Sequence, residues 1–506
     1  MDKKLPVTQL SAALSMAVAY YSYPYLSAIS IGLYVILVLF ALFAAAIAFF
    51  RTITSVPSVT HLHRGPAPGL RQMGILVISL AVGFSLGIAA RRSVSGPAEL
   101  GLPVENIRAV RGLLREDPRT LHGGSGFGVL ELQGSSGDGG LRVSSRGKIP
   151  VFFPAESIPR IREFGRGAEI YTEGRVSQGS MGLLFNATSV HIVNPAPPLE
   201  SFRTSLRLNL LERFQARQDR QDAPVWGGLA SALLLGVRDD LNVDMAEGFR
   251  NAGSSYVLAL SGMHLAIISG VLAFLIRRPL GIRRASLVGA LFIVFYVFLA
   301  GFQPSLVRSA LMYLMGTVAV WGLLKRNVIA LLCMAFIIQL VFQSDSGISL
   351  GFIFSYLALF GILTLGESLK CLFRGRLPEI INASLSASLG AFIFTAPIVA
   401  IYFDSLRPIG ILAGPLLALM AAPFMILSLA ALLVSFMPLP LWGILDFILI
   451  RLYGLIDITV SLAGQVPGIK ISNPVAILVF SGLFTLLALF IHKKDQIYRN
   501  KIAAFV

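Results

Sequence analysis

Long apolar runs without a single charge recur along this chain. The stretches 30–50 and 474–491 are examples, with 21 and 18 residues. About 20 apolar residues in a helix cross the hydrocarbon core of a bilayer. Because several such runs follow the first one, a cleavable signal peptide is not expected. With 55% hydrophobic and 13% charged residues, the chain is predicted to be a polytopic α-helical membrane protein.

Polar residues gather between these runs and divide the chain into regions. We predict N-terminal transmembrane helices at 1–92, a β domain at 93–200, an amphipathic linker helix at 201–225, a transmembrane core at 226–492 and a cytoplasmic tail at 493–506. The fold class is therefore a helical membrane protein with an inserted small all-β, extracytoplasmic domain.

The β domain is predicted from five β-rich runs separated by Gly, Ser, Pro and Asp. So many short strands in about a hundred residues favour a compact barrel of the oligonucleotide-binding (OB) type, which can bind single-stranded nucleic acid. Phe127, Phe152, Phe153 and Tyr171 are either contacts for such a ligand or core residues. Residues 91–200 hold 13 basic and 11 acidic side chains, so charge does not decide between these alternatives.

The net charge of +16 follows the membrane topology. The polar stretch 91–223 holds 18 basic and 14 acidic residues, so most of the excess lies in the membrane segments and their short loops. The positive-inside rule predicts this distribution, which is no evidence for DNA binding. Basic residues at the start place the N-terminus in the cytoplasm. Spans near 7–23, 30–50 and 73–90 then place the β domain on the outer side of the membrane.

Three segments of the second half are less regular. Arginines alternate with leucines in 201–222, which predicts an amphipathic helix at the membrane surface or with a solvated basic side. The apolar segment 226–237 is too short to span and is expected to be interfacial or re-entrant. Pro415 and Pro423 are expected to interrupt the segment 408–436.

Three predicted spans each carry polar side chains on one face. These are Ser254, Ser261 and His264 in the span 254–276, Ser305, Arg308 and Ser309 in 305–324, and Ser384, Ser388 and Thr395 in 384–403. Polar groups at membrane depth are costly, so they usually face a protein interior or a water-filled path. The three faces therefore predict a shared polar interior. Alternatively, the hydroxyls bond to carbonyls one turn back, His264 is structural, and Arg308 reaches the membrane interface.

Four segments resemble motifs of the ComEC competence-protein family. They are LLLGVRDDLNVDMAEGFRNAGSSYVLALSGMHLAIISG at 233–270, LAGFQPSLVRSALM at 299–312, SLGFIFSYLALFGI at 349–362 and PIGILAGPLLALMAAP at 408–423. Their order and spacing also match, and the resemblance extends from about residue 30 to about 490. The SGxH and GFxPSxxR elements are its most specific parts.

The resemblance implies an inner-membrane channel through which single-stranded DNA enters the cytoplasm during natural transformation. The residues on family motif positions are Arg250, Gly253, Ser261, Gly262, His264, Gly301, Pro304, Ser305, Arg308 and Ser355. We add Ser384 and Ser388 from the polar faces as candidates for the transport path. Arg250 and Arg308 are the best-placed cations for DNA phosphates.

The chain also departs from the family pattern. Tyr256, Ile353 and Gly414 stand where the family usually has His, Gln and Asn. Many members continue into a metallo-β-lactamase-like nuclease domain, whereas this chain is expected to be a member without it. Six histidines and no metal-ligand spacing predict no metal site and no cofactor.

Two functions from different classes remain. One is a passive DNA-uptake channel, whose partners would be single-stranded DNA, membrane lipid, other uptake proteins and a separate motor ATPase, because no GxxxxGK[ST] phosphate loop is present. The other is a ComEC-like transporter or envelope protein for another polar or lipid-linked substrate. A second copy of the chain and a separate nuclease stay open as partners. An enzyme is not predicted, because His264 has no credible nucleophile and acid.

Overall fold

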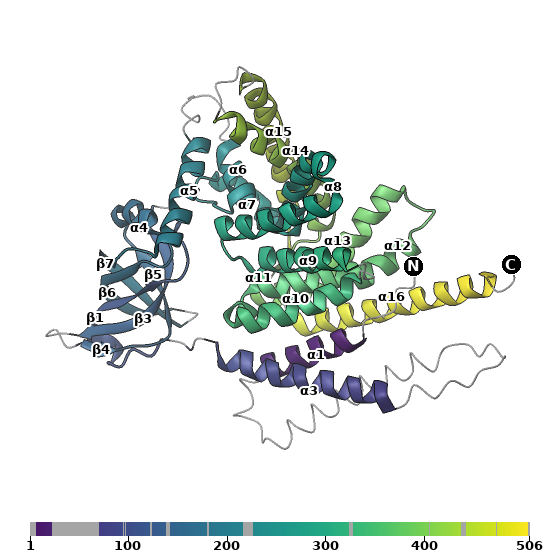
Figure 1. Ribbon diagram of the computed structural model, residues 1–506, viewed down its shortest axis with the longest axis horizontal. Coiled ribbons are helices and arrows are strands. Elements are labelled where there is room, and N and C mark those ends of the chain that lie inside the picture. Colours follow the sequence, from purple (N-terminus) through teal and green to yellow (C-terminus); the bar gives the residue numbers. More distant parts are fainter. Residues whose placement is uncertain are drawn as a thin grey trace. The chain divides into compact units, whose positions relative to one another are not determined.

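The computed structural model describes residues 7–22, 70–94, 96, 98–121, 124–137, 142–179, 182–215, 226–322, 327–403, 405–436, 442–471 and 473–503 (Figure 1). Contacts divide the chain into two compact units, Met1–Val94 with Leu311–Tyr356, and Ser95–Ala310 with Leu357–Val506. The span predicted at 30–50 and the end of the predicted linker helix, 216–225, lie outside the described residues.

The first unit is built on a close helix pair. It contains α1 (Val7–Ser22), α3 (Leu70–Arg92), α10 (Val328–Phe342), η6 (Ser344–Ile348) and most of α11 (Leu350–Gly361). A Cβ atom on Gly83 would lie 2.3 Å from the carbonyl oxygen of Ala12, and one on Gly87 would lie 2.5 Å from that of Met16. Glycines one turn apart therefore let α3 approach α1 closely, as is common in membrane helices. The two helices agree with the first and third predicted spans.

The second unit begins with a closed β-barrel. Its strands are β1 (Ile107–Leu114), β2 (Arg119–Thr120), β3 (Gly126–Gly137), β4 (Arg142–Ser144), β5 (Lys148–Phe153), β6 (Glu169–Gly179) and β7 (Gly182–Asn194). They follow the order β1-β6-β7-β5-β3-β2, and β1 also pairs with β3 and closes the barrel. The β5–β7 pairing is parallel, and α4 (Ile158–Phe164) lies between β5 and β6. The predicted OB-like barrel is confirmed.

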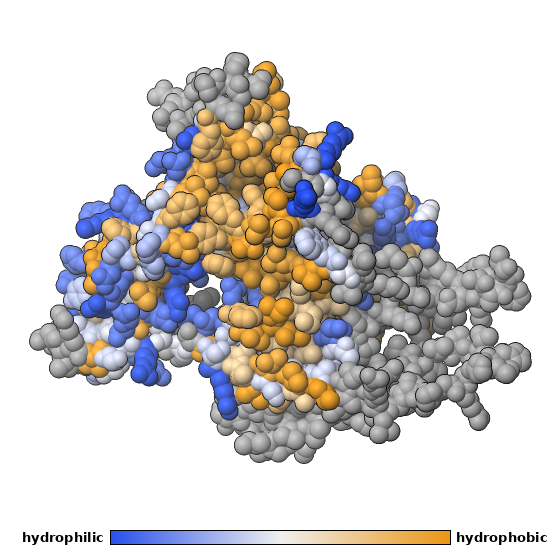
Figure 2. All heavy atoms as spheres, viewed as in Figure 1, coloured by the Kyte–Doolittle hydropathy of each residue, from blue (hydrophilic) through white to orange (hydrophobic). Residues whose placement is uncertain are grey.

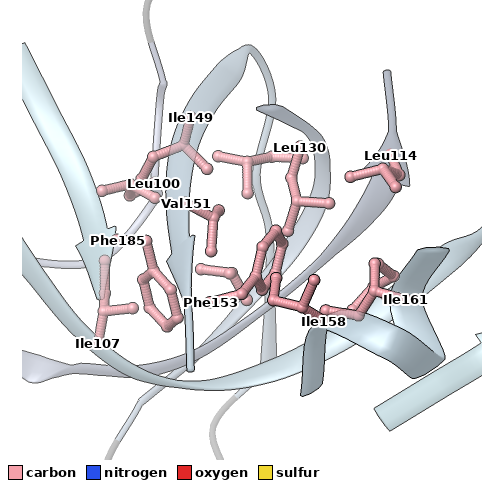
Figure 3. Close-up of a cluster of buried hydrophobic side chains, with 13 residues drawn as sticks. Leu100, Ile107, Leu114, Leu130, Ile149, Val151, Phe153, Ile158, Ile161 and Phe185 are labelled. Atoms are coloured by element: carbon pink, nitrogen blue, oxygen red, sulfur yellow. The ribbon is translucent and has the colours of Figure 1, made fainter. Parts of the chain in front are cut away.

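Alternating side chains fill this barrel. Ile149, Val151 and Phe153 on β5 point inward and meet Leu130 of β3 and Phe185 of β7 (Figure 3). Burial of such side chains stabilises the fold by about 1.5–3 kcal/mol each.

The aromatic residues singled out in the β domain have different places. Phe153 is 1% exposed and belongs to the core. Phe127 and Phe152 pack edge to face, with ring centroids 5.5 Å apart. Tyr171 is half-buried on β6 and stays accessible from outside the barrel.

Helix α5 (Pro198–Gln215) follows the barrel and is joined to it by ion pairs. Arg203 is 1% exposed and donates to Asp117, at 2.6 Å, and to Glu200. Arg207 donates to the other carboxylate oxygen of Asp117 and, at 3.4 Å, to the carbonyl of Leu235. The predicted basic face at a membrane surface or in solvent is therefore wrong for these two arginines, because a barrel carboxylate binds them.

A second carboxylate links the barrel to the helices that follow. Asp239 accepts a hydrogen bond of 3.2 Å from the backbone N–H of Thr120 and forms an ion pair with Arg162 of α4. We call Asp117, Asp239, Arg162, Arg203 and Arg207 the charged junction. It joins the barrel, α5 and the loop after Leu235 within the second unit.

The rest of the second unit is helical. Its helices are α6 (Trp226–Leu235), α7 (Val243–Asn251), η5 (Ser255–Val257), α8 (Gly262–Ala300), α9 (Pro304–Trp321, whose end belongs to the first unit), η7 (Ile362–Gly366), α12 (Glu367–Leu372), α13 (Glu379–Phe403), α14 (Gly410–Val434), α15 (Trp442–Gly464) and α16 (Pro474–Ala503). A short pair, β8 (Ser405–Leu406) with β9 (Ile469–Lys470), joins two loops.

Several segments are long and apolar enough to cross a membrane. They are Ser255–Pro279, Leu350–Leu372, Glu379–Phe403 and Gly410–Val434, and shorter apolar helices accompany them. Figure 2 shows apolar residues gathered over the helical part, whereas hydrophilic residues gather over the barrel. Large apolar side chains such as Leu419, Phe480 and Leu486 are exposed, as expected of surfaces that lie in lipid.

Two expectations for the helical part are corrected. Pro415 and Pro423 do not interrupt the segment 408–436, because α14 runs through both; membrane helices tolerate proline where neighbouring groups satisfy the freed carbonyls. Every residue of α6 is buried in protein, which excludes a helix lying on the membrane surface and leaves the re-entrant alternative. Helix α16 continues to Ala503, and the cytoplasmic tail expected from 493 stays a prediction.

Candidate functional site

The segment predicted as a span from residue 254 begins with a turn. After α7 the chain forms a left-handed Gly253 (φ +66°) and the single turn η5, and α8 starts only at Gly262. Ser254 is buried in this turn, and Ser261 is the N-cap residue of α8. The prediction that Ser254, Ser261 and His264 share one helix face is therefore wrong, since two of the three precede the helix.

His264 closes the first turn of α8. The backbone N–H of Ser261 donates to its Nδ1 at 3.2 Å, and the Ser261 hydroxyl lies 2.9 Å from the same nitrogen. The N–H requires Nδ1 to be an acceptor, so the hydroxyl donates as well. The imidazole is fully buried. Ser261 and His264 thus form a helix cap.

A second helix start lies at the GFQPS element. Gly301 ends α8 with φ +98°, a conformation that suits glycine, and Pro304 occupies the first position of α9. The hydroxyl of Ser305 donates to the carbonyl of Leu260, 2.5 Å away, in the turn before α8. This bond ties the two helix starts together although 45 residues separate them.

Two glycines and an arginine lie where the starts of α8 and α9 meet. A Cβ atom on Gly262 would lie 2.8 Å from the Ser309 hydroxyl oxygen and 3.8 Å from Nη2 of Arg308, so this glycine leaves the room that the α9 side chains occupy. Arg308 is only 8% exposed. Gly236 (φ +70°) ends α6 beside Leu260 and the side-chain amide of Gln303. We call the set Leu260, Ser261, Gly262, His264, Gln303, Ser305, Arg308 and Ser309 the helix-start cluster.

Helix N-termini and an arginine give the helix-start cluster a positive electrostatic potential. The first N–H groups of a helix have no intrahelical acceptor and carry about half a positive charge. The start of α8 lies beside the guanidinium of Arg308, and the Ser305–Leu260 hydrogen bond brings the start of α9 to the same place. Helix N-termini are frequent binding sites for anions, phosphates among them. The arrangement therefore favours a negatively charged group.

Other residues predicted to line the transport path lie outside the helix-start cluster. Gly253 packs on the start of α14, where its Cβ would lie 2.9 Å from the carbonyl oxygen of Arg407. Arg250 is exposed and pairs with Glu247 at 3.5 Å. Ser384 is exposed on α13 and Ser388 is half-buried, and within the described ranges no hydrogen bond joins either to the helix-start cluster.

Ser355 lies on α11 in the first compact unit, so it is described apart from the cluster. The buried polar contact of α13 involves residues that the sequence analysis did not select. Ser386 donates to Asn382, and Asn382 donates to the carbonyl of Lys370 at 3.0 Å. An asparagine inside an apolar segment was the available signal for this contact.

Two departures from the family pattern are neighbours in space. A Cβ atom on Gly414 would lie 1.8 Å from the hydroxyl oxygen of Tyr256, so the tyrosine occupies the space next to the glycine. A larger residue at 414 is incompatible with this position of the ring. Tyr256 and Gly414 are therefore in direct contact.

The described part of the chain contains no group of three His, Cys, Asp or Glu side chains placed to hold a metal ion. The cluster instead consists of hydroxyls, an imidazole, an amide and a guanidinium. Such groups bind and orient a ligand through hydrogen bonds and charge.

The comparisons place these residues within a known family. ComE operon protein 3 of Bacillus subtilis (strain 168) is 30% identical over 189 residues, which cover 36% of this chain and 23% of that protein. An uncharacterized protein of Aquifex aeolicus (strain VF5) is 26% identical over 235 residues, or 46% of this chain and 54% of that protein. The matches thus span about a quarter and about half of these relatives. No solved structure matches the chain significantly.

The family model described as Competence protein matches residues 233–495, more than half of the chain. This range contains both helix starts and Arg308, and it confirms the resemblance to the ComEC family that the sequence motifs indicated. The chain belongs to the competence protein family.

Proposed function

We propose that this protein is a membrane component of the path by which single-stranded DNA enters the cytoplasm of a competent bacterium. The observation that carries the proposal is the helix-start cluster, in which two helix N-termini and buried Arg308 converge. Membership of the competence protein family supports it, because competence is the capacity to take up DNA.

The chemistry of the cluster suits a phosphodiester. Each phosphate carries a negative charge that is costly in a low-dielectric environment unless cations or oriented N–H groups compensate it. Arg308 supplies a charge that is never lost, close to the start of α8. Gly262 leaves the room that brings Ser309 and Arg308 of α9 against the start of α8.

The path works as a passive conduit in this proposal. A separate motor ATPase and other uptake proteins supply the energy. The barrel faces the outer side of the inner membrane, and the DNA strand passes from the barrel toward the helical core. A second copy of the chain and a separate nuclease are further partners to be tested.

A second candidate function has its own observation. Tyr256 and Gly414 replace two residues that are polar in the family pattern, and the two are in direct contact. A path altered in this way favours a transporter or envelope protein of the same fold for another polar or lipid-linked substrate.

Uptake of labelled DNA into the cytoplasm of the native host separates the two. A deletion strain is complemented with wild type, Arg308→Ala, Arg308→Lys or His264→Ala, and with Arg278→Ala as a control at an exposed arginine of α8. We expect Arg308→Ala to lose import, Arg308→Lys to keep part of it, and Arg278→Ala to match wild type at equal protein levels. Import that survives the deletion would rule out the DNA function, and full import with Arg308→Ala would remove the cluster from the path.

A further inference from the structure

Three side chains form a row across the outside of the barrel. Arg111 of β1 lies directly opposite Tyr171 of β6, and Tyr171 lies directly opposite His191 of β7. Residues directly opposite on antiparallel neighbours project from the same face of a sheet. The rings of Tyr171 and His191 are 6.5 Å apart with planes inclined by 35°. A cation and two rings thus cross three strands in one line.

This row lines a hollow. The cavity has a volume of about 440 Å³, within the range of about 300–1,000 Å³ that is typical of small-molecule sites. Its remaining lining includes small residues, such as Ala109, Gly134 and Ser136. Gly134 lies opposite Arg111 on the next strand, so no side chain covers the guanidinium from that side. We call this cavity the row groove.

Arg111 has one ion-pair partner and remains partly exposed. Its Nε donates to Glu169 at 2.7 Å, while its side chain remains 47% exposed. Asn194 also donates to Glu169, which fixes the carboxylate from the other side. The Arg111 hydrogen bond holds the pKa of Glu169 below its usual range, so the pair stays charged at neutral pH. The terminal nitrogens of Arg111 are left to meet a ligand in the row groove.

We propose that the row groove binds an unpaired base of single-stranded DNA, which stacks on Tyr171 beside His191 while Arg111 contacts a base acceptor or the adjoining phosphate. This rests on the proposed function, which brings a single strand to the barrel. Aromatic rings that stack bases, with arginine nearby, hold single strands on barrels of this type. Arg111 is the charged side chain among the lining residues, so the interaction depends mainly on the bases and only weakly on salt.

An oligonucleotide without bases tests this. The full-length protein in detergent micelles is titrated into fluorescein-labelled dT12 or into a 12-mer of abasic sites, and Kd is read by anisotropy. Wild type is expected to bind dT12 about 5- to 150-fold more tightly, the equivalent of about 1–3 kcal/mol per stacked base. Tyr171→Ala should lose this preference, and Tyr171→Phe should keep it. Phe127→Ala, an aromatic on β3 that is paired with Phe152, should bind like wild type.

Each outcome decides the proposal. Equal binding of both oligonucleotides by wild type overturns the base site, as does the absence of binding to either. A preference for dT12 that survives in Tyr171→Ala places the base site elsewhere and overturns it too. The import experiment with Arg308 variants does not depend on the row groove, so the DNA path can stand when the base site fails.

Discussion

Tyr256 and Gly414 give a test of how two single residues depend on each other. The Gly414→Asn change places a side chain where the tyrosine hydroxyl now lies. Overpacking a core destabilises by about 1–3 kcal/mol, and because Tyr256 is 54% exposed and can move, we expect a smaller loss here, seen as a modestly lower Tm in micelles. Histidine is shorter than tyrosine, so in a Tyr256→His background the Gly414→Asn change should lower the Tm clearly less. Thermal unfolding followed by intrinsic fluorescence measures all four proteins of the cycle.

A glycine without neighbours provides the control. A Cβ atom on Gly454 of α15 would meet no atom of the described residues within 4 Å, so Gly454→Asn should leave Tm nearly unchanged. Contacting residues show interaction energies of about 0.5–3 kcal/mol in such cycles. Strictly additive effects of the changes at 256 and 414 would mean that the two residues do not share this space.

The charged junction is an element-scale feature, because it links the barrel to α5 through Asp117. Asp117→Asn removes one of the two carboxylates that pair with buried Arg203 and leaves only Glu200. Breaking a fully buried pair costs about 3–5 kcal/mol, and we expect about 1–3 kcal/mol here because Asp117 is 25% exposed. Glu116→Gln alters an exposed pair with Arg119 and should change the free energy of unfolding by less than about 1 kcal/mol. Urea unfolding of both variants measures the difference.

The junction also predicts a pH dependence. Burial alone would raise the pKa of Asp117, but Arg207 and Arg203 outweigh it and hold the pKa below its ordinary value. A lowered carboxyl pKa adds stability that is present above the unfolded value of about 3.9 and is lost as the pH falls through the folded value. Wild type and Asp117→Asn should therefore differ in Tm by a constant amount from pH 8 to pH 5. A difference that shrinks within that range would contradict the assignment.

The elements that the sequence predicted correctly are those marked by a local pattern of residues. Alternating apolar residues such as Ile149, Val151 and Phe153 mark a strand wherever it packs, so the barrel was predictable. The start of α8 was not, because an apolar turn at 254–260 has the same composition as a membrane helix. The partner of Arg203 was not predictable either, since Asp117 lies 86 residues away and only the fold brings them together.

At the scale of the whole chain, membrane orientation decides which compartment the row groove faces. Helices with exposed apolar side chains and a barrel with a hydrophilic surface require different surroundings. Positive loops favour the cytoplasm, and Lys370, Arg374 and Arg376 form one such loop near the end of α12. We therefore expect the barrel and this loop on opposite sides of the inner membrane.

Single cysteines test that expectation. Arg175 of β6 and Arg376 are both exposed, and each is replaced by cysteine in a chain whose Cys333 and Cys371 are changed to alanine and serine. In intact spheroplasts a membrane-impermeant maleimide should label Arg175→Cys at once. Arg376→Cys should react only after the membrane is permeabilised, because a lipid bilayer separates it from the reagent. The reverse order would invert the topology and place the row groove in the cytoplasm, where an incoming strand would meet it only after crossing.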